Sequence, residues 1–169
     1  QIFEKLNVRN NDRYEFVYPS YQLTKQLDQN FDIDGSLSLN STGYIKNYNT
    51  NIYEKVIVND LLLKTDHKIS DAGFKSNFDY LIKNINTDAT KSEKYKDEIS
   101  NTLASMIKYN LSYPLIKQTK NYINKFKPLM AIRFSPNKSK NIKDNDTRLD
   151  ISNVYGLNRI SSIENVEEG

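Results

Sequence analysis

The chain has 169 residues, of which 37% are hydrophobic and 27% charged, and it contains no cysteine. The lack of cysteine excludes a disulfide framework, a thiolate metal site and a cysteine nucleophile. Lysine and arginine number 24 and aspartate and glutamate 21, giving a formal net charge of +3. Because these charges are interspersed rather than gathered into a basic stripe, we expect no nucleic-acid partner.

Hydrophobic and polar residues alternate in segment after segment, and polar, Asn-rich turns separate the segments. A period of two is typical of a β-strand whose two faces lie in different surroundings. The alternation predicts strands at residues 13–22, 30–43, 50–63, 69–83, 99–113, 125–135 and 147–158, and an eighth beginning near Glu164. The low hydrophobic content suits a barrel wall, where each strand needs one apolar face, better than a two-sheet core.

The predicted fold is all-β: part of an antiparallel, up-and-down transmembrane β-barrel. Seen alone, such a piece would be an open curved sheet of about seven or eight strands with two exposed edges. Residues 1–169 are expected to belong to a single barrel domain, and both ends of the chain look truncated. In an up-and-down order every second connection lies on the same side. This places longer outward loops near residues 46, 90 and 141 and periplasmic turns near 26, 66 and 161, although the connection at 114–124 is long for such a turn.

One segment also fits a helix. Over residues 92–108 and just beyond, larger side chains fall at spacings of three and four, which is typical of an amphipathic helix. These residues are Tyr95, Ile99, Leu103, Met106, Ile107 and Asn110. The strand interpretation gains from alternation that continues to Tyr113, so both remain open.

The four prolines are expected to mark turns and strand ends, because proline cannot donate to a strand ladder. Pro114 and Pro136 fit strand ends and Pro19 ends a run of strand residues, whereas Pro128 should start a paired region or mark a bulge. Tyrosines near the strand ends fit either an aromatic girdle at the lipid headgroups or ordinary strand formers.

No residue pattern indicates catalysis. His67, the single histidine, is expected in an exposed turn, and no catalytic or phosphate-binding motif occurs. Asp32 and Asp34 share a strand face, but a polar barrel lumen explains them better than acid–base catalysis. We therefore expect no enzyme activity, no cofactor and no metal site.

Five segments together resemble the C-terminal barrel region of the LPS-assembly protein (LptD, organic solvent tolerance) family. They are DRYEFVYPSYQL at 12–23, GSLSLNSTGYIKNYNTNIYEKVIVNDL at 35–61, YNLSYPLIK at 109–117, FKPLMAIRFSPN at 126–137 and NVYGLNRISSIENVEEG at 153–169. The resemblance covers nearly all of this chain but a minor part of a full family member. It places the chain in the middle of the barrel wall.

This resemblance implies a protein of the Gram-negative outer membrane that delivers lipopolysaccharide to the outer leaflet. The implied partners are an LptE-type lipoprotein plug, a periplasmic Lpt bridge protein, lipopolysaccharide and outer-membrane lipid. The residues implied to face lipid are Phe31, Ile33, Leu37 and Leu39, and those implied to face a wet lumen are Asp32, Asp34, Ser36 and Ser38. A generic porin-like channel and a soluble β-sandwich binding domain are the competing interpretations.

Overall fold

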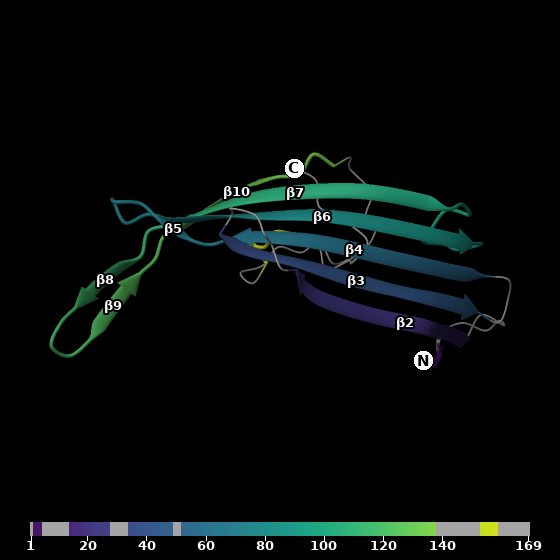
Figure 1. Ribbon diagram of the computed structural model, residues 1–169. Coiled ribbons are helices and arrows are strands. Elements are labelled where there is room, and N and C mark those ends of the chain that lie inside the picture. The colour runs from purple at the N-terminus through teal and green to yellow at the C-terminus, as the bar shows by residue number, and fades with distance from the viewer. Residues whose placement is uncertain (1, 5–13, 28–33, 49–51, 138–152, 159–169) are drawn as a thin grey trace. The chain divides into compact units, whose positions relative to one another are not determined.

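A computed structural model of the chain describes residues 2–4, 14–27, 34–48, 52–137 and 153–158. Every regular element in these ranges is a β-strand (Figure 1). None of the described residues forms a helix long and apolar enough to cross a membrane. The all-β prediction is confirmed.

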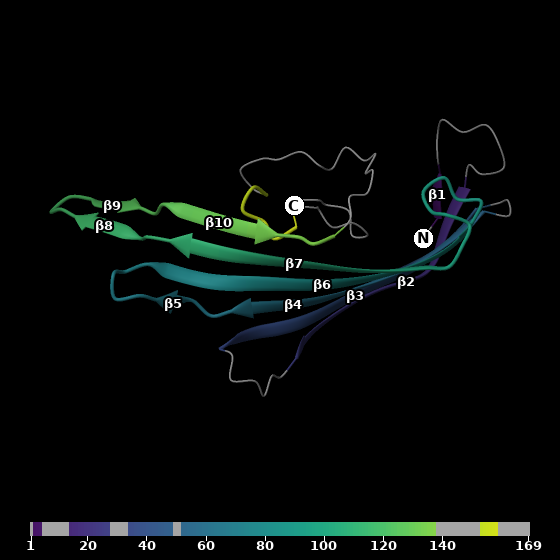
Figure 2. The same ribbon diagram turned by 90° about the horizontal axis from the view of Figure 1, so that it is seen from above.

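Most of the strands form one open sheet, in which the long neighbouring strands follow each other in chain order (Figure 2). Its path is β1-β2-β3-β4-β6-β7-β10, and the short β5 pairs with β6. The bounds are β1 Ile2–Glu4, β2 Tyr14–Leu27, β3 Gly35–Tyr48, β4 Tyr53–Thr65, β5 Lys68–Ile69, β6 Lys75–Thr90, β7 Ser100–Ser112 and β10 Leu129–Phe134. Strands β8 (Leu115–Gln118) and β9 (Ile123–Phe126) form a separate antiparallel hairpin. Among the described strands β1 and β10 do not pair, so the expected open sheet is confirmed.

The long strands run through two compact units. Unit 1 comprises Gln1–Gln26, Ser38–Leu61 and Ile82–Ala104. Unit 2 comprises Leu27–Leu37, Leu62–Leu81 and Ser105–Gly169. In unit 1 the buried side chains of Val56, Val58 and Ile85 pack together with the half-buried Tyr44 and Tyr95. Burial of such side chains is the main stabilising contribution expected in this unit.

Strands β3 and β6 extend beyond the predicted strands. The alternation at 30–43 and 69–83 led us to expect their ends there, but β3 runs to Tyr48 and β6 to Thr90. The expected outward loop near residue 46 and the turn near 26 are therefore wrong, because both positions lie inside strands. The polar side chains in these longer strand ends have partners. In β3, Lys46 pairs with Glu15 of β2. In β6, Asn86 donates a hydrogen bond to Asn84. A loop is present near 90, and the predicted connections near 141 and 161 lie outside the described residues.

The helix alternative for residues 92–108 is wrong. Residues 100–112 form β7, and burial alternates along it: Ala104 and Met106 are buried, whereas Leu103 and Ile107 are exposed. The spacings of three and four therefore arose from apolar residues on both faces of a strand. Of the predicted strand at 147–158, residues 147–152 lie outside the described ranges, and 153–158 form a turn in which Gly156 N–H donates to the Asn153 carbonyl at 2.7 Å.

The predicted strand at 125–135 is divided at Pro128, which separates β9 from β10. The Pro128 carbonyl accepts the Tyr113 amide at 3.2 Å, so this proline does begin a paired region, as expected. Pro114 and Pro136 follow strand ends, also as expected. Pro19 instead lies inside β2 after a cis peptide bond, which corrects its expected place at a strand end. Proline is tolerated there because β1 pairs only with Tyr14–Phe16, leaving the rest of β2 at an edge of the described sheet.

Candidate functional site

The candidate site is a sheet with two chemically different faces, and unit 2 shows the difference most clearly. In a strand, residues two apart share a face. Along β6, Asp79 and Leu81 lie on one face and Phe78 and Tyr80 on the other. The side chains of Asp79 and Leu81 are buried, whereas those of Phe78 and Tyr80 are exposed. The charged group is thus covered and the aromatic rings face outward.

A hydrogen-bonded ion pair lies on the buried face of unit 2. The Lys108 ammonium is 3.1 Å from Asp79 Oδ2, and both side chains are about nine-tenths buried. Asn110 donates to Asp79 Oδ2 and Asn77 donates to Asp79 Oδ1, each at 3.0 Å. Lys108 also donates to the Tyr155 carbonyl at 2.8 Å, which ties residues 153–158 to this face. Buried charges require such partners, because transferring an unpaired ion out of water costs several kcal/mol.

The opposite face of unit 2 is apolar and exposed. Aromatic side chains pair across β6 and β7, with ring centroids 4.8 Å apart for Phe78 and Tyr109. Strand β10 adds Met130, Ile132 and Phe134, whose direct partners on β7 are Leu111, Tyr109 and Ile107. Residues opposite each other in an antiparallel pair share a face, so these side chains form one surface. Ile132 and Phe134 are 57% and 60% exposed, which is unusual for adjacent large apolar side chains.

Unit 1 contains a second ion pair on the face of its apolar cluster. Lys83 Nζ lies 2.7 Å and 2.8 Å from the two carboxylate oxygens of Asp60, and Lys83 is only 3% exposed. Lys83 and Ile85 are two apart on β6, and Asp60 and Val58 are two apart on β4. This pair therefore borders the cluster of Val56, Val58 and Ile85.

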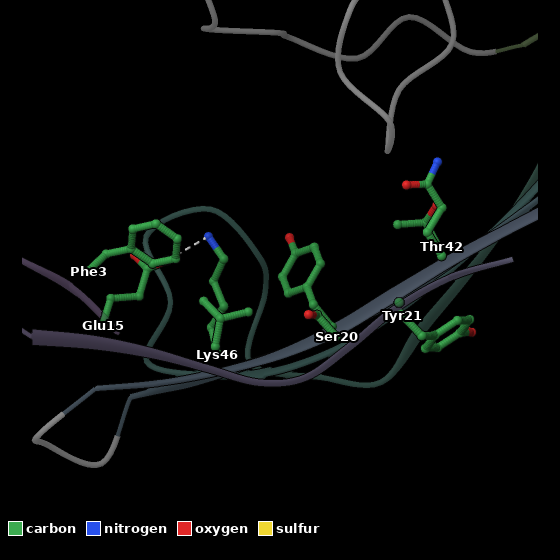
Figure 3. A pocket seen from close by; sticks show the side chains of 10 residues that line it. Phe3, Glu15, Ser20, Tyr21, Thr42 and Lys46 are labelled. Atoms are coloured by element: carbon green, nitrogen blue, oxygen red, sulfur yellow. Dashed lines mark ion pairs between the residues drawn. The ribbon is translucent and has the colours of Figure 1, made fainter. Parts of the chain in front are cut away.

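An open pocket of about 590 Å³ lies over β2 and β3 in unit 1 (Figure 3). Glu15 and Lys46 point toward each other there, with 3.0 Å between Lys46 Nζ and Glu15 Oε1. Tyr48 donates to the other carboxylate oxygen at 3.1 Å. Tyr21 points to the opposite side of the strands, where its hydroxyl is 3.2 Å from that of Ser41.

The residues proposed from the sequence for lumen and lipid lie on or near β3, and only some are described. Phe31, Asp32 and Ile33 lie outside the described residues. The Asp34 carbonyl accepts the Asp66 amide at 2.9 Å, at the start of β3. Ser36 and Ser38 alternate along β3 with Leu37 and Leu39, as expected, and only Ser36 among these four is exposed. Their lipid and lumen environments stay predictions.

Sequence reasoning missed the charged residues that form the two ion pairs: Asp60 with Lys83, and Asp79 with Lys108. A usable signal existed on β6, where Asp79 and Lys83 occupy positions alternate to Phe78, Tyr80 and Ile82. A search for charged residues that alternate with large apolar residues in a predicted strand would have found Asp79 and Lys83. His67 is exposed between β4 and β5, and the described ranges hold no group of three or more metal-ligating side chains.

In unit 2 this arrangement holds Asp79 and Lys108 as a bonded pair on one face and presents exposed apolar side chains on the other, whereas in unit 1 the ion pair and the apolar cluster share a face. The arrangement in unit 2 suits separation of an aqueous from an apolar environment. Searches of protein-family models, of curated protein sequences and of solved structures find no match for the chain.

Proposed function

We propose that this chain forms part of the wall of a transmembrane β-barrel, with its apolar face toward lipid and its ion-paired face toward a polar lumen. One observation carries the proposal: in unit 2 the buried face holds Asp79 and Lys108 while the exposed face holds Ile132 and Phe134. A water-soluble sheet shows the reverse arrangement, because its apolar face is buried and its charges are solvated. A barrel strand alternates apolar residues toward lipid with polar residues toward the lumen.

Within this proposal, we infer that the barrel belongs to the lipopolysaccharide-delivery machinery of the Gram-negative outer membrane. The five sequence segments that resemble the LptD family support this finer assignment. The partners would be an LptE-type lipoprotein, a periplasmic Lpt bridge protein and lipopolysaccharide itself. The chain would act as a scaffold, and we assign no covalent step to any of its residues.

The barrel-wall proposal is tested with two labels on adjacent residues of β10. Because the chain has no cysteine, Ile132→Cys and Ala131→Cys each give a single site for a nitroxide spin label. Ile132 is opposite Tyr109 on the apolar face, and Ala131 is opposite Asn110 on the polar face. In proteoliposomes of the full-length protein, we expect the label at 132 to collide with oxygen dissolved in lipid. The label at 131 should collide with a water-soluble nickel chelate.

Equal exposure of both labels to the nickel chelate would overturn the barrel-wall proposal and favour a soluble sheet domain. The lipopolysaccharide assignment has a separate test: an LptE-type lipoprotein should co-purify with the barrel and raise the temperature at which it loses its compact gel mobility. Lipid-facing alternation without any effect of the lipoprotein would indicate a porin-like channel instead.

A further inference from the structure

The β8–β9 hairpin is a separate two-stranded sheet with its own regular pairing. Leu115 pairs with Phe126 at one end, and Gln118 pairs with Ile123 at the other. At the tip, the Thr119 amide and hydroxyl both donate to the Tyr122 carbonyl at 2.9 Å. An isolated hairpin of this kind is only marginally stable in water, because two strands cannot bury an apolar face by themselves.

Large apolar side chains of the hairpin are nevertheless exposed. They are Leu115, Ile116, Tyr122, Ile123 and Phe126. Ile116 and Phe126 are 68% and 67% exposed, and they lie on opposite faces because their positions differ by one along the register. Neither face of the hairpin is therefore covered within the described residues.

The charge of the hairpin has one sign only. Four lysines lie between Pro114 and Pro128, a segment without any aspartate or glutamate: Lys117, Lys120, Lys125 and Lys127. All four side chains are exposed. The sequence that follows, residues 129–143, also lacks aspartate and glutamate and adds Arg133, Lys138, Lys140 and Lys143. The charges of this part of the chain are therefore not interspersed, and the hairpin lies in a local concentration of positive charge.

Cationic and apolar groups share each face of the hairpin. On one face Leu115 and Phe126 lie beside Lys117, and on the other Ile116 and Ile123 lie beside Lys125. Such a combination suits the boundary between headgroups and acyl chains, where apolar side chains enter the bilayer. The lysine ammonium groups, on long flexible stems, can then reach phosphate groups.

We propose that the β8–β9 hairpin binds the surface of a bilayer that contains anionic phospholipid. The lysines would bind the phosphates, and the exposed apolar side chains would insert at the headgroup level. The proposal goes beyond the barrel-wall function and rests on the residues of the hairpin alone. Each lysine near an anionic surface strengthens binding about fivefold, and salt screens this attraction.

The test uses a fluorophore that reports polarity, attached to Asn121→Cys at the hairpin tip of the full-length protein. The protein is reconstituted in phosphatidylcholine alone or in phosphatidylcholine with phosphatidylglycerol. We expect a blue shift of the emission only with phosphatidylglycerol, reversed by added salt. Replacing Lys117, Lys120 and Lys125 by glutamine should weaken the binding of the hairpin to the lipid surface by a factor on the order of 100.

A matched control variant removes three lysines from the β6–β7 connection: Lys91, Lys94 and Lys96. Acidic residues neighbour those lysines, so the control should leave the emission shift unchanged. The proposal is overturned if the emission wavelength is the same in the two lipid mixtures. It is also overturned if the control variant loses as much of the blue shift as the variant without the hairpin lysines. It is also overturned if inositol hexaphosphate without a bilayer produces the same shift. Failure of the barrel-wall proposal is read separately, from the spin labels on β10.

Discussion

Replacing Lys108 by methionine is expected to destabilise the protein by about 2 to 3 kcal/mol. Lys108 Nζ lies 3.1 Å from Asp79 Oδ2, and at an effective dielectric constant of about 20 this attraction is about 5 kcal/mol before desolvation is subtracted. Methionine is unbranched and one atom shorter than lysine, so it replaces most of the aliphatic stem but leaves the Asp79 carboxylate without its cation. Asn77 and Asn110 still donate to that carboxylate, so the cost should fall at or below the lower end of the roughly 3 to 5 kcal/mol seen for unpaired buried charges.

The assay is a double-mutant cycle with Lys108→Met, Asp79→Asn and the double variant. Urea unfolding of the detergent-refolded protein, followed by far-UV circular dichroism and tyrosine fluorescence, gives the four free energies of unfolding. We expect a coupling energy of about 2 kcal/mol between the two side chains. The control cycle uses Lys96 and Glu98, 3.7 Å apart with both side chains well exposed, where the coupling should be about 0 to 0.5 kcal/mol.

Additive effects of Lys108→Met and Asp79→Asn, to within about 0.5 kcal/mol, would refute this reasoning. Such a result would mean that water screens the buried face of unit 2 as effectively as it screens the Lys96–Glu98 pair. The two charges would then be neighbours without being coupled.

Two further substitutions test packing within unit 1. Gly43→Ala would place a methyl group 2.8 Å from Cζ of Tyr21, so we expect a loss of about 1 to 3 kcal/mol in urea unfolding, and Tyr21→Ala in the same chain should remove most of that loss. Val56→Ala, at a fully buried side chain, should lower the free energy of unfolding by about 2 kcal/mol. The control Val154→Ala, at an exposed side chain, should change the unfolding midpoint little. Equal effects of the two substitutions would contradict the assignment of the core.

The alternation of the sequence was sufficient to predict the all-β class and the five long strands β2, β3, β4, β6 and β7, because a period of two is a local property of each strand. It did not predict that the strand at 125–135 is divided or that residues 153–158 form a turn. The ends of strands were harder to predict. Lys46 lies in β3 and pairs with Glu15 of β2, a partner that is distant in sequence. The polar stretch around Asn84 and Asn86 likewise looked like a loop and is part of β6.

The candidate site was only partly visible for a related reason. The sequence showed which residues share a strand face, and Leu37 and Leu39 do alternate with Ser36 and Ser38. It could not show that Asp79 lies beside Lys108, because the pairing of β6 with β7 depends on a register that alternation alone does not fix. The β8–β9 hairpin was missed because Pro114 was taken as a strand end, so that residues 114–124 were expected to form a connection.

Hydrogen bonds from Ser92 and Tyr95 hold the β6–β7 connection to strands β4 and β3. The Ser92 hydroxyl donates to Glu54 at 2.6 Å and accepts the amides of Lys94 and Tyr95, while the Tyr95 hydroxyl is 3.1 Å from that of Tyr44. An epitope tag or protease site inserted among residues 92–95 would have to break these bonds. The segment that follows, 96–98, is exposed, so an insertion there should leave the hydrogen bonds of Ser92 and Tyr95 in place. Within the barrel-wall proposal, residues 96–98 are thus the place to introduce an antibody epitope that tests on which side of the membrane the β6–β7 connection lies.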